Sequence, residues 1–179
     1  ALINALHDAD AEVRHQSAWS LGQLEDRRAV APLGVALGDA DATMRQTAAW
    51  ALGQLEDPSA GPALAGALKD SDVEVRRKAA WALGQLELRT APQALVDALR
   101  DQDADVRRTA AWALSQMEDP RAVPALRAML ADSDAGARRN AINALAQIRD
   151  SSAMQALIGA MQSRDAEVRR AAARALGER

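Results

Sequence analysis

The chain has 179 residues, of which 49% are hydrophobic but only 2% are aromatic, with no Phe and no Tyr, so its apolar mass is mostly Ala, Leu and Val. This composition favours close-packed helices and excludes a strand-rich fold, which needs the β-branched and aromatic residues that fit a pleated surface. The net charge of -3 and the pI near 5.4 give no overall attraction to nucleic acid or to an anionic membrane, and the lack of Cys excludes disulfides and thiolate metal sites.

The N-terminus begins inside a repeating pattern. Residues Ala1–Leu6 align with the middle of a later repeat, so we expect the chain to be a piece of a longer protein whose first repeat is truncated. No apolar run of membrane-spanning length and no signal-peptide pattern occurs in the printed residues. We therefore expect a cytoplasmic protein without a membrane partner.

The strongest feature of the sequence is self-similarity with a period of 31 residues and no insertion. Trp, Arg and Leu recur at this spacing, at Trp19, Trp50, Trp81 and Trp112, at Arg14, Arg45, Arg76, Arg107, Arg138 and Arg169, and at Leu21, Leu52, Leu83, Leu114, Leu145 and Leu176. A fixed period of this length indicates small structural units that stack on one another, because a single unit is too small to bury its own apolar face.

Each repeat predicts the same two helices in the same order. An Asp closes a polar loop and is placed to cap the following helix, at Asp10, Asp41, Asp72, Asp103, Asp134 and Asp165. The capped second helix is clearest over 75–86, where Val75, Ala79, Leu83 and Leu86 form one apolar stripe. The first helix is clearest over 119–130, where Asp119-Pro120 offers a cap and a first-turn proline.

These elements predict an all-α chain, an α-α superhelix or solenoid of about six 31-residue two-helix repeats that forms one domain over 1–179. The pattern V-R-x-x-A-A-x-A-L-G-x-L followed by D-P-x-A-V-P-A-L resembles HEAT-like repeats of the phycobilisome-lyase type. The resemblance implies that the second helices line a concave side and that the role is mostly protein binding. Leu88-Arg89 departs from the usual Asp-Pro turn, and Gly136-Ala137 weakens the start of one second helix.

The candidate partner-binding residues form two columns on the second helices. Taking 100° per residue, Trp19 lies about 150° from the centre of the apolar stripe, so the Trp column is expected to face outward with the Gln column beside it. The predicted site comprises Trp19, Trp50, Trp81 and Trp112 with Gln23, Gln54, Gln85 and Gln116. This W-x-x-x-Q spacing resembles the W-x-x-x-N arrays by which armadillo proteins hold extended peptides, although Gln replaces Asn.

A packing interpretation stands beside the binding one. Each Trp could lie over Gly22, Gly53 or Gly84, or over the equivalent small residue of the adjoining repeat, and fill a gap between second helices. The two interpretations are compatible, because a ring that is half covered by a neighbour still offers one face.

Arginines suggest a second hypothesis. Arg77, Arg108, Arg139 and Arg170 form a basic stripe that could follow a phosphate backbone, and HEAT-like DNA glycosylases grip DNA with a basic concave surface. An acid stands one turn before three of these arginines, at Glu74, Asp105 and Glu167, and is placed to neutralise them. We therefore rank nucleic acid behind a protein or peptide partner, and include Arg77, Arg108 and Arg139 among the partner-binding residues.

Two further expectations concern the loops and the ends. The Arg14 column is expected to bond to loop aspartates such as Asp10 or, in the next repeat, Asp41. Repeat ends without a polar capping repeat expose apolar surface, so end-to-end self-association of a structural repeat module is a third hypothesis.

The sequence offers little for catalysis. Only His7 and His15 occur, neither recurs in the other repeats, and no zinc-protease motif, Gly-rich phosphate loop or Cys nucleophile is present. The paired loop aspartates lack the Gly and the distal Glu of a calcium-binding loop, so capping explains them better. The sequence therefore predicts a non-catalytic interaction scaffold with no catalytic residue, no metal site and no cofactor.

Overall fold

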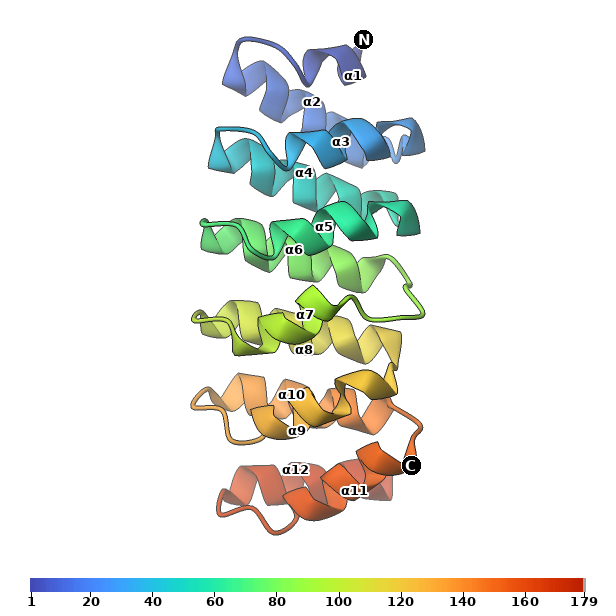
Figure 1. Ribbon diagram of the computed structural model, residues 1–179, viewed down its shortest axis with the longest axis vertical. Coiled ribbons are helices and arrows are strands. Elements are labelled where there is room, and N and C mark those ends of the chain that lie inside the picture. Colours follow the sequence, from blue (N-terminus) through green and yellow to red (C-terminus); the bar gives the residue numbers. More distant parts are fainter. Residues whose placement is uncertain (179) are drawn as a thin grey trace. The chain divides into compact units, whose positions relative to one another are not determined.

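The computed structural model describes residues 1–178, and within that range every regular element is a helix or a 3-10 turn, with no β-strand (Figure 1). This confirms the predicted all-α fold of two-helix repeats. The chain forms two compact units, which we call unit 1 (Ala1–Leu88) and unit 2 (Arg89–Arg179).

Unit 1 contains α1 (Leu2–Ala5), α2 (Ala11–Gln23), α3 (Val30–Ala36), α4 (Ala42–Leu55), α5 (Gly61–Ala67) and α6 (Val73–Gln85). Unit 2 contains α7 (Gln93–Asp97), α8 (Ala104–Met117), α9 (Val123–Met129), α10 (Ala135–Gln147), α11 (Ser151–Ala160) and α12 (Ala166–Gly177). Three of the short first helices begin with or follow a 3-10 turn, at Arg27–Ala29, Pro58–Ala60 and Pro120–Ala122, and a fourth turn, Ala98–Arg100, ends α7.

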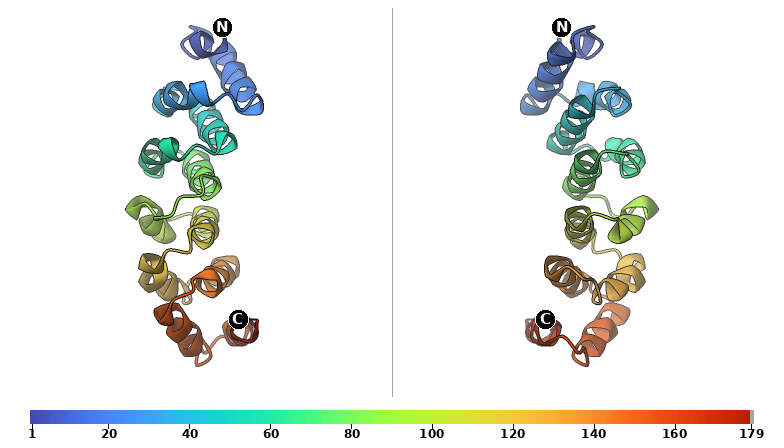
Figure 2. Two further views of the ribbon diagram at one scale, coloured as in Figure 1. Left: turned by 90° about the vertical axis from the view of Figure 1, so that its right-hand side faces the viewer. Right: turned by 90° about the vertical axis from the view of Figure 1, so that its left-hand side faces the viewer.

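The two helices of each repeat lie in two layers. In unit 1 the second helices α2, α4 and α6 pack on one another in succession, and α3 and α5 cover them from one side (Figure 2). In unit 2 α8, α10 and α12 pack in the same way under α7, α9 and α11. Each unit is therefore a stack of helix pairs whose core lies between the layers.

The predicted caps explain where the second helices begin. The carboxylate of Asp41 accepts from the backbone N–H of Met44 at 2.8 Å, and that of Asp134 accepts from Ala137 at 2.7 Å. The other four aspartates cap α2, α6, α8 and α12 in the same manner. Because a free first turn leaves several amides without a partner, these carboxylates stabilise each helix start, and the sequence prediction is confirmed.

The core consists of the predicted apolar stripe, with one exception. Val75, Ala79, Leu83 and Leu86 are completely buried. The corresponding Val13 of α2 and Leu24 directly after it are 39% and 66% exposed, so the stripe of the first repeat is only partly buried. Within residues 1–178, α2 packs closely against α1 and α4, whereas α4 packs against α2, α3 and α6.

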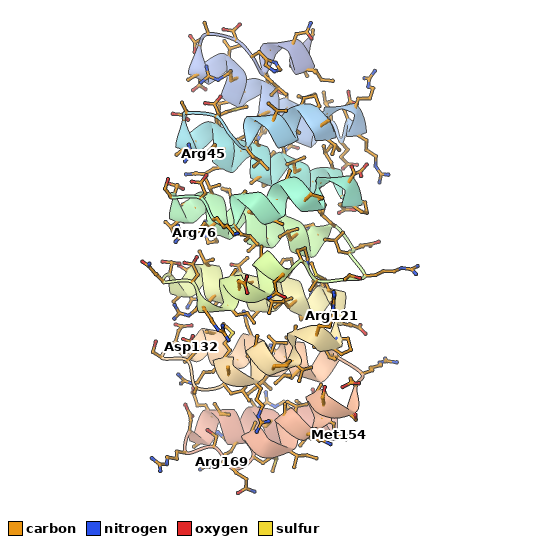
Figure 3. All side chains as sticks on the ribbon, viewed as in Figure 1. Arg45, Arg76, Arg121, Asp132, Met154 and Arg169 are labelled. Carbon is orange, nitrogen blue, oxygen red and sulfur yellow. The ribbon has the colours of Figure 1, made fainter. Side chains whose placement is uncertain are left out.

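Arginine side chains tie consecutive loops together. Arg45 is labelled in Figure 3. It donates to both carboxylate oxygens of Asp70 at 2.8 and 2.9 Å, and its Nη1 donates to the carbonyls of Asp39 and Ala40. The same geometry joins Arg14 to Asp39 and Arg107 to Asp132. One guanidinium thus bonds to the loop of its own repeat and to the loop of the next one.

The partner of this arginine differs from the sequence prediction. We expected Arg14 to bond to Asp10 or Asp41, but it bonds to Asp39, the first aspartate of the loop pair. The second aspartate is already committed, because its carboxylate caps the helix. The bonds from Arg14 lower the pKa of Asp39, and those from Arg45 lower the pKa of Asp70, in both cases against the opposing effect of burial.

Asp119 makes a separate link within unit 2. Its buried carboxylate accepts from the backbone N–H of Ala91 at 2.8 Å and from the guanidinium of Arg121. These bonds, chiefly those from Arg121, lower the pKa of Asp119 to about 2. The repeat that begins at Leu88-Arg89 lacks its own Asp-Pro turn, and the carboxylate of the following repeat supplies the missing acceptor.

Four second helices end on a strained residue. Glu25, Glu56, Glu87 and Glu118 have φ of 49°, 48°, 47° and 49°, and all four side chains are exposed. The left-handed conformation brings Cβ close to the following carbonyl, so this position ordinarily favours glycine. The repeat therefore stores backbone strain at each of these helix ends.

We predict that Glu56→Gly raises the free energy of unfolding by about 1 kcal/mol, because glycine adopts the left-handed conformation without strain. Glu56→Ala is the matched control, since it removes the same exposed side chain but keeps the strain. Urea unfolding followed by circular dichroism measures both changes. An equal gain in the two variants would mean that the side chain, and not the backbone, is responsible.

Candidate partner-binding surface

The indole rings of unit 1 lie across glycines of the preceding second helix. A Cβ added to Gly22 would stand 2.8 Å from Cζ3 of Trp50, and one added to Gly53 would stand 2.5 Å from Cζ3 of Trp81. The same added atoms would approach the Cα of Ala51 and of Ala82 to 3.0 Å, so the helix backbones are also close. The glycines, which are unfavourable inside a helix, are explained by this approach of ring and backbone.

The rings are only partly covered by this contact. Trp50 and Trp81 are half-buried, and Trp19, which has no second helix before it, is 45% exposed. The packing interpretation and the outward-facing interpretation therefore both hold for unit 1. One side of the ring is fixed against the preceding helix, and the rest of its apolar surface remains open.

The glutamines one turn further on add polar groups to the same helices. Gln23 is exposed and Gln54 and Gln85 are half-buried, and within residues 1–178 none of the three side-chain amides has a hydrogen bond. An amide without a protein partner is available to bond to a peptide backbone, as both donor and acceptor. We call the Trp and Gln columns of α2, α4 and α6 the Trp/Gln surface.

Unit 2 carries the same columns in altered form. Trp112 is half-buried, but Gln116 is engaged with Ser115, whose hydroxyl also donates to the carbonyl of Trp112. Ser115 stands at the position of Gly22 and Gly53, and the next repeat has Asn143 in place of the ring that would lie on it. Ring and glycine are therefore replaced together, as their contact requires.

The arginines of the predicted basic stripe differ in their partners. Arg77 bonds to Glu74, and Arg108 bonds to Asp105 on its own helix and to Asp134 in the next repeat. No carboxylate of residues 1–178 lies within 4.0 Å of Arg139 or Arg170. The predicted i, i+3 neutralisation is thus present for the first two arginines and absent for the pair Glu167 and Arg170.

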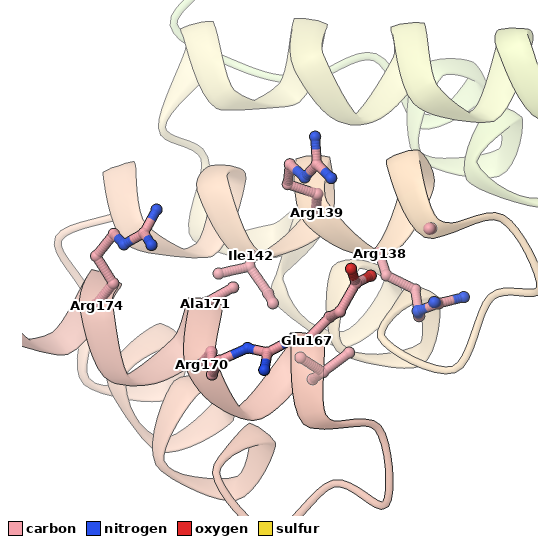
Figure 4. Close-up of a pocket in the computed structure, with 9 residues that line it drawn as sticks. Arg138, Arg139, Ile142, Glu167, Arg170, Ala171 and Arg174 are labelled. Carbon is pink, nitrogen blue, oxygen red and sulfur yellow. The ribbon is translucent and has the colours of Figure 1, made fainter.

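Unit 2 also contains a pocket of about 170 Å³ between α10 and α12. Figure 4 shows Ile142 and Ala171 in its centre, with Arg139, Arg170 and Arg174 around them and Glu167 beside Arg138. Arg139 and Arg170 belong to the predicted basic stripe, but no cavity was predicted beside them. The signal that could have found it is the loss of the repeat's usual side chains at 171 and 174.

Chemical groups for catalysis are sparse in the described structure. His7 is exposed, and Nδ1 of His15 stands 3.8 Å from Glu12. Residues 1–178 contain no cluster of three or more His, Asp or Glu side chains that could hold a metal ion. None of the helices in that range has the length and apolarity needed to cross a membrane.

Stacked helix pairs with a repeated outer surface define the class of α-helical solenoid repeat proteins. Within that class the chain belongs to the HEAT-repeat family, because residues 1–84, 62–141 and 129–179 match HEAT repeats. No curated protein matches the sequence.

Several solved structures share the fold. The complex of CpcE and CpcF of phycocyanin lyase from Nostoc sp. PCC7120 contains a chain that is 26% identical over 98% of this chain and 74% of its own length, with a TM-score of 0.73. An engineered protein is 25% identical over 98% and 94% of the two chains, with a TM-score of 0.71. A designed armadillo repeat protein in complex with the peptide (KR)4 is 19% identical over 98% and 97%, with a TM-score of 0.71.

The contact between ring and glycine predicts that a Gly→Ala substitution has opposite effects on stability at Gly53 and at Gly66. Gly53→Ala should lower the free energy of unfolding and shift the indole N–H resonance of Trp81, because the added methyl displaces the ring. Gly66→Ala, in α5 with no atom within 4 Å of the added Cβ, should instead raise stability by about 1 kcal/mol. Thermal unfolding and NMR measure both, and a stabilised Gly53→Ala with an unshifted Trp81 resonance would refute the contact.

Proposed function

We propose that this chain is a non-catalytic interaction scaffold that binds an extended segment of a partner protein on the Trp/Gln surface of unit 1. The observation that carries the proposal is the half-covered state of Trp50 and Trp81, which are held in place on one side and open on the other. Trp112 and Gln116 are the corresponding residues of unit 2. Apolar rings with polar amides one turn away are typical of protein interaction sites.

The geometry favours a peptide over a small ligand. The rings recur once per repeat on consecutive helices, which lie about 10 Å apart in packed helical proteins, so the surface is long and regular. A peptide in an extended conformation offers side chains to the rings and backbone groups to the free amides at regular intervals. Because packing already fixes the rings, little side-chain entropy is lost on binding.

The likenesses give background to this proposal. The CpcE and CpcF chains form a complex with each other, and the designed armadillo repeat protein holds the peptide (KR)4. The armadillo design is too distant in sequence for the roles of its residues to be transferred to this chain, so the likeness supports the fold alone. The rings and amides of this chain itself support the proposal.

We predict that linear peptides selected from a phage-displayed random library for binding to the intact chain lose at least tenfold in affinity on Trp50→Ala/Trp81→Ala/Trp112→Ala. Because these rings also pack, Gln54→Ala/Gln85→Ala is the variant that tests binding without disturbing the stack, and it should weaken the same peptides severalfold. Isothermal titration calorimetry measures affinity, and circular dichroism checks helical content.

Two outcomes would contradict the proposal. One is that the library yields no peptide that binds the intact chain. The other is that selected peptides bind the Gln variant and a folded Trp variant as tightly as the intact chain, which would place their site elsewhere.

A second candidate function is head-to-tail association of this chain with itself. Two interactions join consecutive repeats, the bond from arginine to aspartate and the contact of ring with glycine. In the first and last repeats of residues 1–178, one group of each pair has no partner. Within residues 1–178, Asp8, the equivalent of Asp39, accepts the same loop bond from the N–H of Asp10 but no bond from an arginine. In the same range Arg169 donates to the carbonyls of its own loop and to no carboxylate. Trp19 rests on no glycine, and Gly177 has no atom within 4 Å of an added Cβ.

The charge pair allows a direct test of association. Arg169→Asp should lower the weight-average mass measured by sedimentation at high protein concentration, because it sets two carboxylates against each other, and Asp8→Arg/Arg169→Asp should restore it. Arg164→Asp is the control at an exposed neighbouring arginine. If the intact chain sediments as a monomer at every concentration, or if the double variant restores nothing, this second candidate is wrong.

Nucleic-acid binding through Arg77, Arg108, Arg139 and Arg170 stays a prediction with less support. The first two arginines already bond to acids of the protein, so a continuous positive stripe is not available to a phosphate backbone.

A further inference from the structure

We propose that the pocket between α10 and α12 binds an oxyanion, and that its occupant is the carboxylate side chain of an acidic peptide segment. The pocket lies wholly in unit 2 and is independent of the Trp/Gln surface. The inference rests on a comparison of this junction with the junction of α8 and α10 in the same unit, where the corresponding side chains satisfy one another.

The pocket exists because two positions that line it carry different residues from those of other repeats. At the α8–α10 junction Asn140 reaches across and donates to the carbonyl of Arg108 at 2.9 Å. Its equivalent at the next junction is Ala171, whose methyl makes no such bond and lines the pocket. Arg174 stands where unit 1 has a ring, so no indole covers the hollow.

The positive charge of Arg139 is uncompensated because one of its two acidic partners is absent and the other is bonded to a different arginine. Arg108 pairs with Asp105, one turn before it, and with Asp134 of the next repeat. One turn before Arg139 the chain has Gly136, which carries no carboxylate. The equivalent of Asp134 in the next repeat is Asp165, and it bonds to Arg138 at 2.9 Å. Gly136 leaves this space to the side chain of Arg108, since a Cβ there would stand 2.6 Å from Cδ of Arg108.

Arg138 is itself incompletely satisfied. Its equivalent Arg107 bonds to both oxygens of Asp132 at 2.7 and 2.9 Å. The equivalent of Asp132 in the last repeat is Ser163, which has no carboxylate. Arg138 therefore bonds to one oxygen of Asp165, and within residues 1–178 its buried Nε has no hydrogen-bond partner. The lining therefore holds Arg138, Arg139, Arg170 and Arg174 against Glu167 alone.

An oxyanion is the ligand that guanidinium groups recognise best, through paired N–H donors. Ile142, Val168 and Ala171 form an apolar floor, which suits the methylene stem of an acidic side chain more than the polar sugar of a nucleic acid. The neighbouring Arg108 is tied to acids, so the free positive charge is confined to this junction and does not continue along a strand. An isolated carboxylate on a short stem fits both properties.

The test measures binding of a fluorescein-labelled hexaglutamate peptide to the intact 179-residue chain by fluorescence anisotropy at low ionic strength. We expect saturable binding that weakens at least tenfold in Arg174→Trp, which places the ring of the other repeats beside the hollow and removes one charge. Arg139→Gln should weaken it severalfold. Arg127→Gln, at an exposed arginine of α9 outside the pocket, makes the same charge change and should leave affinity within twofold.

Competition separates the sources of the oxyanion, and backbone NMR locates it. Acetate should displace the peptide at lower concentration than inorganic phosphate does, and it should shift amide resonances of α10 and α12. The proposal is overturned if binding is not saturable, if Arg127→Gln weakens it as much as Arg139→Gln, or if a folded Arg174→Trp binds as the intact chain does. Displacement by phosphate alone, or tighter binding of a duplex DNA at the same site, would overturn the carboxylate assignment.

Discussion

The register within each unit depends on an arginine in each repeat that bonds to two loops at once. In unit 1 Arg14 and Arg45 each hold two carbonyls of their own loop and both carboxylate oxygens of the next loop. A bidentate pair fixes both distance and orientation, so adjacent second helices are held at one rotation about their axes. The close contact of rings with glycines requires that rotation, because a shift of one residue would set the ring against a side chain.

Most of the fold could be predicted from the sequence because it depends on local signals that recur. The six capping aspartates and the apolar stripe are read directly from the period, and the structure confirms the caps and, except at Val13 and Leu24, the burial of the stripe. What the period does not show is competition between neighbouring residues. Asp41 and Asp39 are both within reach of an arginine in the sequence, and only the structure shows that capping occupies one and leaves the other.

The candidate surfaces show the same limit. A helical wheel places Trp50 away from the stripe, but it does not contain the preceding helix, so it left open whether the ring is packed or exposed. The pocket of unit 2 was invisible for a related reason. It arises because Ala171 and Ser163 lack the polar side chains that Asn140 and Asp132 have at the equivalent positions. The effect of these two changes is recognised only once the structure shows that such side chains would bond to a backbone carbonyl and to Arg138.

The indole and the glycine beneath it belong to different repeats, and this has a consequence for how such chains diversify. Each 31-residue segment contributes a ring, which packs on the preceding segment, and a glycine, which contacts the ring of the following segment. Exchange of one segment therefore replaces both. A newly inserted segment must therefore match both of its neighbours, whereas a copy of a segment that carries both the ring and the glycine, as the repeat with Trp50 and Gly53 does, matches itself. Growth by copying is thus the route that this architecture tolerates best, and gradual change is confined to pairs of positions that change together, as Ser115 and Asn143 illustrate.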